Sequence, residues 1–236
     1  CFSIYLISPS NRLFKYADDS TLLVPQNSDC SIVKEFDNVK QWSSSHKLLI
    51  NNSKTKEIIF WKSKMAKNKH DVDLIDGIER VESVTLLGVI FNSELSWSSH
   101  INSMLSQISQ RYYLISQLKQ MSLDLKSLDQ VFNALVLSRL RYAIEAFSGN
   151  LLSSDIDRIN AVFRKAHRWE LTHKVHVFQF IASEADRKLV RKMKSNDHCL
   201  HSLVPAIRKN NRYNLRNNNS TFEFPIIKNN KYLKIF

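Results

Sequence analysis

Turn-forming and cross-linking residues are scarce in this chain of 236 residues. Glycine occurs 3 times and proline 4 times, which argues against a sandwich or barrel of many short strands and favours long helices with a small sheet. The three cysteines, Cys1, Cys30 and Cys199, are scattered along the sequence. They supply neither a disulfide framework nor the paired spacing of a zinc site, so we expect a reducing compartment and no disulfide-linked partner.

Long hydrophobic runs are also missing. No apolar stretch approaches the roughly 20 residues that a membrane span needs, and the N-terminus lacks the basic and apolar regions of a signal peptide. We therefore expect no membrane partner and an intracellular protein, nuclear or cytoplasmic, that is not secreted. The first residue is Cys1 rather than methionine, so we also expect the sequence to be a piece of a longer one.

Charge is distributed unevenly along the chain. Residues 1–100 hold 12 basic and 12 acidic side chains, whereas residues 101–236 hold 22 basic and 10 acidic ones, so the whole net charge of +12 lies in the second part. Such an asymmetry indicates a polyanionic partner, most often a nucleic acid. A solvated basic helical surface would produce the same composition, and charge alone does not separate the two interpretations.

The first part of the sequence predicts a small sheet with one helix. Two β-prone runs, 12–16 and 21–24, flank Ala17-Asp18-Asp19-Ser20 and indicate a hairpin with an acidic tip. A helix is expected over 28–46, capped by Ser28 or Asp29. A turn at 51–53 comes next, and then strands at 55–61, 72–75 and 81–91, with Asp76-Gly77 as the turn between the last two and a basic loop at 62–70.

After Trp97 the period of the apolar residues becomes helical. Four helices are expected, marked by Ile101 to Leu118, by Leu128 to Tyr142 with Gly149 as the stop, by Ile156 to Ala166 with Ser153 or Ser154 as the cap, and by Ala185 to Met193. We predict an α+β chain with three parts. A small antiparallel sheet with one helix spans 1–96, a helical bundle spans 97–203, and a basic tail rich in Asn, Lys and Arg spans 204–236.

The adjacent carboxylates of Asp18 and Asp19 carry the most specific chemistry. Because neighbouring strand residues point to opposite faces, only a turn lets both carboxylates approach one site. A hard cation such as Mg²⁺, which prefers oxygen ligands, would relieve their repulsion. In phosphoryl transfer two such ions lie about 3.5–4 Å apart and act on the attacking and leaving oxygens. The alternative interpretation is a simple polar turn, since Asp and Ser are common turn residues.

In its apolar frame, Tyr16-Ala17-Asp18-Asp19 resembles the Tyr-x-Asp-Asp box of reverse transcriptases, which lies on a hairpin in the polymerase palm. Further blocks occur in the family's order. They are Phe2 to Leu6, the Asn51, Lys54, Thr55 and Ile58-Ile59-Phe60 block, and Leu86-Leu87-Gly88-Val89 with Leu95, Trp97 and His100, which resembles the primer grip. Residues 113–119, 137–142 and 158–169 resemble the segments downstream of the palm in non-LTR (LINE-type) retrotransposons. The resemblance covers roughly residues 1–200.

This resemblance implies a role for each matching residue. Asp18 and Asp19 would be catalytic carboxylates that hold Mg²⁺, and Lys54 would act on the phosphates of the incoming deoxynucleoside triphosphate. Tyr16 would lie near the primer end, and Leu87 and Gly88 would hold the primer strand. The basic helices would form a thumb that tracks an RNA–DNA hybrid of template and primer through Arg158, Lys165 and Arg168.

The departures from the family pattern are as informative as the matches. The fingers, the first palm strand with its metal-binding Asp, and the Gln-Gly segment of the nucleotide pocket have no counterpart here. We therefore expect a truncated RNA-directed DNA polymerase that is inactive as this fragment. A non-catalytic, basic nucleic-acid-binding remnant and an unselected genomic relic are the alternatives. His198-Cys199-Leu200-His201 does not complete a zinc site, because only one cysteine is present.

Overall fold

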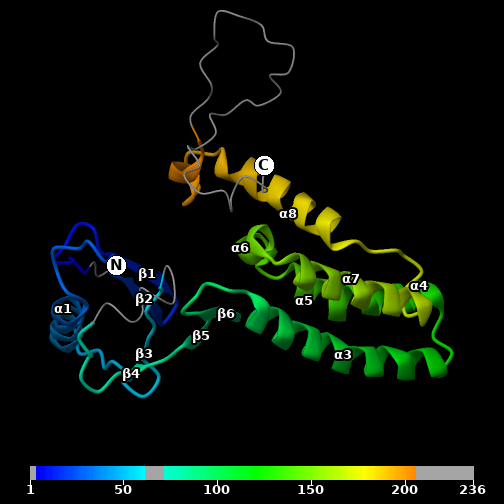
Figure 1. The fold of residues 1–236 in the computed structure, drawn as a ribbon, viewed down its shortest axis with the longest axis horizontal. Helices are drawn as coiled ribbons and strands as arrows, with labels where there is room; N and C mark the ends of the chain where they lie inside the picture. The colour runs from blue at the N-terminus through cyan, green and yellow to red at the C-terminus, as the bar shows by residue number, and fades with distance from the viewer. Residues whose placement is uncertain (1–3, 62–71, 206–236) are drawn as a thin grey trace, which may run out of the picture. The chain divides into compact units, whose positions relative to one another are not determined.

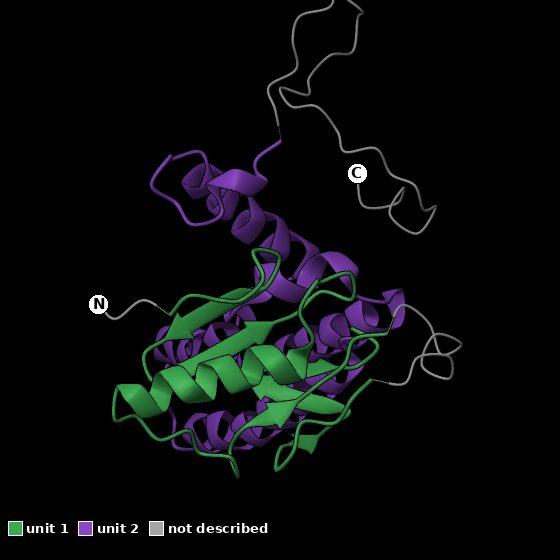
Figure 2. Ribbon diagram, turned by 90° about the vertical axis from the view of Figure 1, so that its left-hand side faces the viewer, with its two compact units in different colours: residues 1–96 green, residues 97–236 purple. Residues whose placement is uncertain are grey.

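A computed structural model of the chain describes residues 4–61 and 72–205. The chain divides into two compact units, Cys1–Ser96 and Trp97–Phe236, which are coloured separately in Figure 2. The first unit holds the described strands and one helix, and the second unit is helical (Figure 1). The chain is thus mixed α and β, in agreement with the coarse prediction of its fold class.

The first unit begins with the expected hairpin. Strand β1 (Arg12–Tyr16) pairs antiparallel with β2 (Asp19–Leu23), so that Arg12 lies opposite Leu23 and Tyr16 opposite Asp19. The connection is therefore a two-residue turn, Ala17-Asp18, which is shorter than the four-residue tip expected from the sequence. Ala17 has a positive φ of 52°, as the first central position of the tight turns that fit the twist of a hairpin requires.

Helix α1 (Ile32–Ser45) begins later than expected. Its N-cap is Ser31, whose side chain accepts a hydrogen bond from the backbone N–H of Lys34. The prediction of Ser28 or Asp29 as the cap was wrong. Ser28 instead donates a hydrogen bond from its hydroxyl to Asn11 (2.7 Å), and residues 28–31 lead into the helix without belonging to it. The apolar side of the helix contributes Phe36 to a small core with Ile75 and Ile78.

The remaining strands of the first unit are shorter than expected. Strand β3 (Lys56–Glu57) pairs in parallel with β4 (Glu79–Arg80), and β5 (Ser83–Leu86) pairs antiparallel with β6 (Val89–Asn92). The described strands therefore form three separate pairs rather than one antiparallel sheet. No strand forms at 72–75, although the turn at Asp76-Gly77 is present. The expected basic loop at 62–70 lies outside the described residues.

The prediction of a single strand over 81–91 was wrong because a turn interrupts it. Leu87 and Gly88 both have positive φ values, 47° and 80°, the combination found in the commonest two-residue hairpin turns. Gly88 adopts this conformation without strain, whereas Leu87 has a Cβ that disfavours it. The stretch from Val84 to Phe91 is apolar except at Thr85 and Gly88, so its hydrophobic pattern does not mark the turn.

The second unit starts with the long helix α3 (Ser98–Gln120), as the apolar spacing predicts. Its buried side chains follow one face, and they are His100, Ile101, Met104, Ile108, Tyr112 and Ile115. The helix packs against α4 (Leu125–Phe132), against the following π-helical segment η1 (Asn133–Leu137) and against α7 (Ser153–Arg168). The Tyr112 hydroxyl donates a 2.9 Å hydrogen bond to the carbonyl of Val162 on α7, which joins the two helices in the core.

The second predicted helix is broken before Gly149. After η1 the chain continues as α5 (Ser138–Arg141), then bends at Tyr142 and Ala143, and resumes as α6 (Ile144–Phe147) with a single turn of 3₁₀ helix, η2 (Ser148–Asn150). Tyr142 is extended and Ala143 has a φ of 52°. The side chains of Ile144 and Phe147 are fully buried after the bend, so burial of this apolar pair accompanies the break.

The last two helices are α7 and α8 (Phe178–Met193), followed by a short 3₁₀ turn, η3 (His201–Leu203). Neither Ser153 nor Ser154 caps α7. Its N-cap is Leu152, without a side-chain hydrogen bond, so that prediction was also wrong. Helix α8 buries Phe178, Ile181 and Ala182. Most of the predicted tail, residues 206–236, lies outside the described residues.

Two further observations bear on the sequence-based expectations. Within 4–61 and 72–205, no helix combines the length and the apolar character that crossing a lipid bilayer would require. In the same ranges Cys30 and Cys199 are both free thiols.

Candidate functional site

The hairpin β1–β2 places Tyr16 and Asp19 on one face. They lie directly opposite each other, and cross-strand partners point to the same side of a sheet. Lys15 points to the other side, where its Nζ lies 4.7 Å from the ring centroid of Trp42 on α1. The hairpin therefore rests on α1 by one face and presents Tyr16, Asp19 and Phe14 on the other, with Asp18 in the turn beside them.

This acidic tip is open to solvent. Ala17, Asp18 and Asp19 are all exposed, and the Tyr16 side chain is exposed to 68%. No group of three side chains that could hold a metal ion occurs in the described part of the chain. Asp18 and Asp19 are thus two accessible carboxylates at one tip. Mg²⁺ is commonly held by one or two carboxylates together with substrate phosphates, so the tip fits one such ion and does not by itself make a two-metal site.

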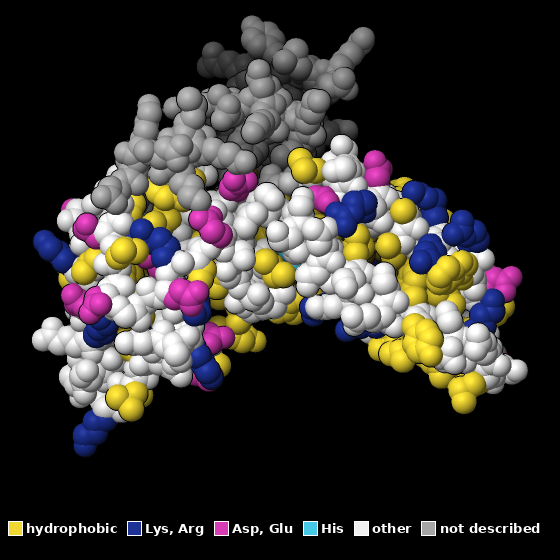
Figure 3. Space-filling view, turned by 60° about the horizontal axis from the view of Figure 1, so that its bottom comes forward, with side chains coloured by type: hydrophobic (Ala, Val, Ile, Leu, Met, Phe, Trp, Pro, Cys, Tyr) yellow, Lys and Arg dark blue, Asp and Glu magenta, His cyan; other side chains and the backbone are white. Residues whose placement is uncertain are grey.

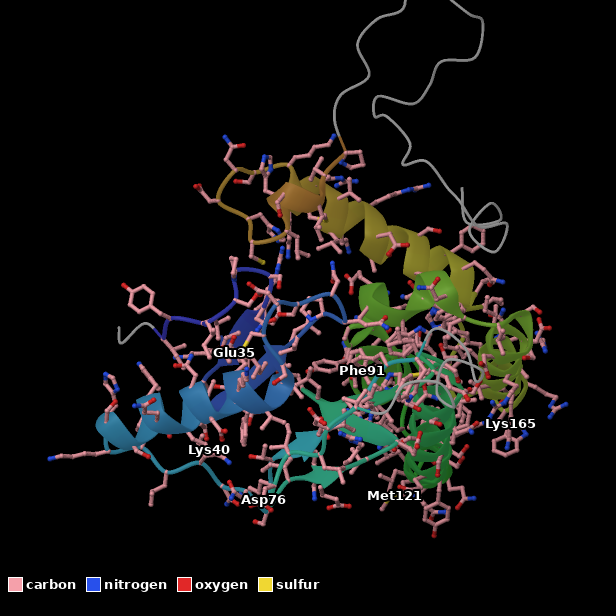
Figure 4. The ribbon with its side chains drawn as sticks, turned by 60° about the vertical axis from the view of Figure 1, so that its left-hand side comes forward. Glu35, Lys40, Asp76, Phe91, Met121 and Lys165 are labelled. Atoms are coloured by element: carbon pink, nitrogen blue, oxygen red, sulfur yellow. The ribbon has the colours of Figure 1, made fainter. Side chains whose placement is uncertain are left out.

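A buried carboxylate behind the hairpin escaped the sequence-based prediction. Glu35, labelled in Figure 4, is fully buried on α1. It accepts hydrogen bonds from the backbone N–H groups of Ile7 (3.0 Å) and Ser8 (3.3 Å) and from the side-chain amides of Asn11 (2.6 Å) and Asn38 (3.1 Å). Burial on its own raises the pKa of Glu35, but these hydrogen bonds outweigh burial and hold the pKa below its ordinary value.

Glu35 thereby ties the segment before β1 to the first turn of α1. The sequence does contain a sign of this buried carboxylate. Around the axis of α1, Glu35 lies between Val39 and Trp42 and therefore on the apolar face of the helix. A charged residue on an apolar face that is buried has to be paired or hydrogen-bonded. Asn38 is a local donor, three residues along the helix, but Ile7, Ser8 and Asn11 lie 24 to 28 residues away along the chain, and no local pattern identifies them.

Lys54 lies in the turn between α1 and β3. Its backbone N–H donates to the carbonyl of Asn51 (3.1 Å), and Asn51 also accepts a hydrogen bond from the Thr55 hydroxyl (2.9 Å). The Lys54 side chain is exposed. These bonds account for the Asn51, Lys54 and Thr55 pattern as a closed turn that leaves the ammonium group in solvent.

Leu87 and Gly88 form the tip of the second hairpin, β5–β6. Leu87 is exposed to 42%, whereas Val89, directly after the turn, is buried. A backbone turn with an exposed side chain is an accessible contact element. The positive φ of Gly88 is a sufficient reason for a glycine at this position of the turn, whether or not another chain approaches it closely.

Arg158 has a structural role within the second unit. Its guanidinium donates to the buried carboxylate of Asp155 (3.0 Å) and to the side-chain oxygen of Asn102 on α3 (2.6 Å). Asp155 also accepts a hydrogen bond from the hydroxyl of Ser98 (2.9 Å). This set of contacts joins the N-terminal turns of α3 and α7, so Arg158 positions the helices and its charge is already paired.

The end of α7 is more open. Lys165 and Arg168 are exposed, and the Lys165 ammonium lies 4.2 Å from the ring centroid of Trp169. Arg164, also exposed, adds a third cation over the same turn of helix. Residues 158–169 contain four Lys or Arg residues and no Asp or Glu. Of the three predicted thumb residues, Lys165 and Arg168 therefore lie within one helical turn of each other, and Arg158 lies two turns away.

A second polar centre also escaped the sequence-based prediction. The buried carboxylate of Asp129 accepts hydrogen bonds through Oδ1 from the Thr172 hydroxyl (2.7 Å) and the His173 backbone N–H (3.1 Å), and its Oδ2 contacts Nδ1 of the His173 ring. Burial raises its pKa, but these partners and Lys174 outweigh burial, so that the pKa is lowered overall. The centre fastens the loop after α7 to α4 across more than 40 residues of sequence.

Comparisons with known proteins add no relative. No protein-family model, no curated protein and no solved structure matches this chain. The function of the chain has to be inferred from its residues and from their arrangement.

Proposed function

We propose that this chain is part of a reverse transcriptase of the non-LTR retrotransposon type, an RNA-directed DNA polymerase that copies an RNA template onto a DNA primer. The observation that carries the proposal is the Tyr16-Ala17-Asp18-Asp19 hairpin. Its two carboxylates occupy the tip and Tyr16 stands opposite Asp19. The blocks at 51–60 and 86–89, which come next in the order of the family, add support.

In this proposal Asp18 and Asp19 bind one Mg²⁺ together with nucleic-acid phosphates, and Tyr16 lies beside the primer end. In the complete enzyme Mg²⁺ supplies stabilisation of the charge that develops on the transferred phosphoryl group. Lys54 contributes a cation for the triphosphate, and the Leu87-Gly88 turn contacts the primer strand. The described residues hold no third carboxylate near the tip, so this fragment does not assemble a polymerase centre.

The second candidate function is a basic nucleic-acid-binding remnant that makes no use of the carboxylates. One observation favours it, namely the exposure of Lys165 and Arg168 on α7, because these cations need no metal ion to contact phosphates. Both candidates require binding of nucleic acid through the second unit, and they differ in whether a metal ion binds at Asp18 and Asp19 next to the primer end.

Metal-directed cleavage separates the two. The chain is bound to an RNA–DNA hybrid with a recessed primer 3′ end, Mg²⁺ is replaced by Fe²⁺, and radicals are generated with ascorbate and peroxide. Cuts clustered at the primer end, lost in Asp18→Asn and in Asp19→Asn but kept in Asp37→Asn, support the reverse transcriptase proposal. Asp37 is a suitable control because it is an exposed carboxylate of the same unit, on α1. Uniform cleavage in all variants would contradict metal binding at the tip and leave the basic nucleic-acid-binding remnant as the supported candidate.

A further inference from the structure

The C-terminal end of α7 combines an exposed aromatic ring with a group of cations. Trp169 is exposed to 44%, although Trp side chains are highly buried on average. Arg164, Lys165 and Arg168 precede it by one to five residues, and all three are exposed. Figure 3 shows basic and hydrophobic side chains interspersed over the helices of the second unit, and Figure 4 labels Lys165.

The backbone at Trp169 is held in a fixed position. Its N–H donates to the carbonyl of Lys165 (3.0 Å), and its carbonyl accepts a hydrogen bond from the Lys119 ammonium on α3 (3.0 Å). The next two N–H groups, of Glu170 and Leu171, close the helix end by bonding to His167 (2.9 Å) and Ala166 (3.0 Å). This is the pattern of a Schellman motif, here with Glu170 in the left-handed position at a φ of 53°.

The ring itself is oriented by Lys165, whose ammonium lies 4.2 Å from the centroid. A cation over one face of an indole ring is an attractive contact, and it leaves the exposed part of the ring to other partners. Lys119 is paired with Glu170 (2.7 Å), whereas Arg164 and Arg168 have no ion-pair partner within the described ranges. An exposed aromatic ring in contact with Lys165 therefore lies at a helix end that also carries the exposed Arg164 and Arg168.

We infer that Trp169 is a stacking platform for an unpaired base of a single-stranded nucleic acid, whose flanking phosphates contact Arg164, Lys165 and Arg168. Stacking on an aromatic side chain next to a cationic track is the usual way in which proteins bind single strands without reading their sequence. The inference rests on the proposed function and extends it, because it places an unpaired strand, rather than the hybrid alone, at the end of α7.

Alternative partners fit the surface less well. An acidic peptide would use the cations but would gain nothing from an exposed indole ring. An apolar partner would have to bury Arg164 and Arg168 without counter-ions, which is costly. A single strand offers both a flat π surface and a regularly spaced negative charge, and it matches both components of the surface at once.

The test compares two probes of equal length, oligo(dT) and its abasic analogue, which has the same phosphates but no bases. The wild-type chain should bind oligo(dT) at least about fivefold more tightly than the abasic strand, the lower end of what stacking of one base contributes. Trp169→Ala should remove this preference and leave the affinity for the abasic strand unchanged. Trp169→Phe should retain part of it, since a smaller ring still stacks.

Further variants keep the inference falsifiable. Replacing Arg164 and Arg168 with Gln should weaken both probes by the same factor, because these side chains contact phosphates in both. If the wild-type chain does not distinguish the probes, or if Trp169→Ala keeps the preference, the inference is overturned while binding of an RNA–DNA hybrid still supports the proposed function. If neither hybrid nor single strand binds at low salt, both the inference and the proposed function fail.

Discussion

The side-chain amide of Asn11 donates a 2.6 Å hydrogen bond to the carboxylate of Glu35, and both residues are buried. Asn11 directly precedes β1, which leads to the acidic tip, and Glu35 lies in the first turn of α1. An isolated two-stranded hairpin is marginally stable in water. The contact between Asn11 and Glu35 therefore helps to hold the Tyr16-Ala17-Asp18-Asp19 hairpin in place against its supporting helix.

Substitution of Glu35 should destabilise the first unit. In Glu35→Gln an NH₂ group replaces one acceptor oxygen and faces donors that the carboxylate now satisfies. Leaving a buried donor unsatisfied costs about 1–3 kcal/mol, so we expect the free energy of unfolding to fall by at least about 2 kcal/mol. Denaturant unfolding followed by the fluorescence of Trp42 and Trp61, both in this unit, measures the change.

The control for this substitution is Asp37→Asn on the exposed side of the same helix. Asp37 lies 3.5 Å from Lys40 in a solvent-exposed ion pair, and such pairs contribute little. We expect a change within about 0.5 kcal/mol. Equal losses for the two variants would show that Glu35 has no special role in fastening the hairpin.

The dependence of stability on pH can be derived from the lowered pKa of Glu35. A carboxyl whose pKa is lower in the folded state than in the unfolded state adds stability above its unfolded value, and this stability is lost as the pH falls through the folded value. The contribution of Glu35 should therefore be complete above its ordinary pKa of about 4.3 and should decline below that pH. The difference in unfolding free energy between wild type and Glu35→Gln, measured from pH 7 downwards, should narrow only in this acidic range. A difference that does not vary with pH would contradict the assignment.

The chain should not extend a primer by itself. In the proposed function Asp18 and Asp19 would hold one Mg²⁺, whereas polymerisation by two-metal phosphoryl transfer would need a further carboxylate. Incubation with an RNA template, a DNA primer, deoxynucleoside triphosphates and Mg²⁺ should leave the primer length unchanged. Extension by the pure protein that disappears in Asp18→Ala would show that these residues do form a complete centre.

Several elements were predictable because their signals are local. The five-turn spacing from Ile101 to Leu118 predicts α3, and the two β-prone runs on either side of the Ala17-Asp18-Asp19-Ser20 turn predict the first hairpin. The breaks at Leu87-Gly88 and at Tyr142-Ala143 were not predicted, because the spacing of the apolar residues continues unchanged on both sides of each break. The turn places Leu87 at positive φ, and the bend does the same for Ala143. Tertiary packing of Val89 and Phe147 outweighs local preference at these points.

The polar centres were unpredictable for a different reason. Most of the donors to Glu35, and both hydrogen-bond donors to Asp129, lie far away in sequence, and their importance appears only when the chain is folded. The charge asymmetry, in contrast, was evident at once. Fifteen Lys and Arg residues against nine Asp and Glu residues lie between 97 and 205, and residues 206–236 add seven basic residues and one acidic residue. The described part of the second unit thus carries about half of the excess.

The salt dependence of binding to an RNA–DNA hybrid is the decisive measurement of whether the second unit binds nucleic acid. If the second unit holds nucleic acid through phosphates, the logarithm of the affinity should fall linearly with the logarithm of salt concentration, by roughly 0.9 per phosphate contact on a B-form duplex. Replacing Arg164, Lys165 and Arg168 with Gln should flatten the slope by roughly one per lost contact. Arg158 is left intact because it joins α3 to α7.

The matched variant replaces Lys34, Lys40 and Lys47 of the first unit with Gln, which removes the same charge from the neutral part of the chain. We expect the salt slope of hybrid binding to be unchanged in this variant and to be lower by about two to three in the variant of α7. Equal slopes for the two variants, or no binding of the hybrid at low salt, would contradict the nucleic-acid role and with it the proposal that the chain is part of a reverse transcriptase.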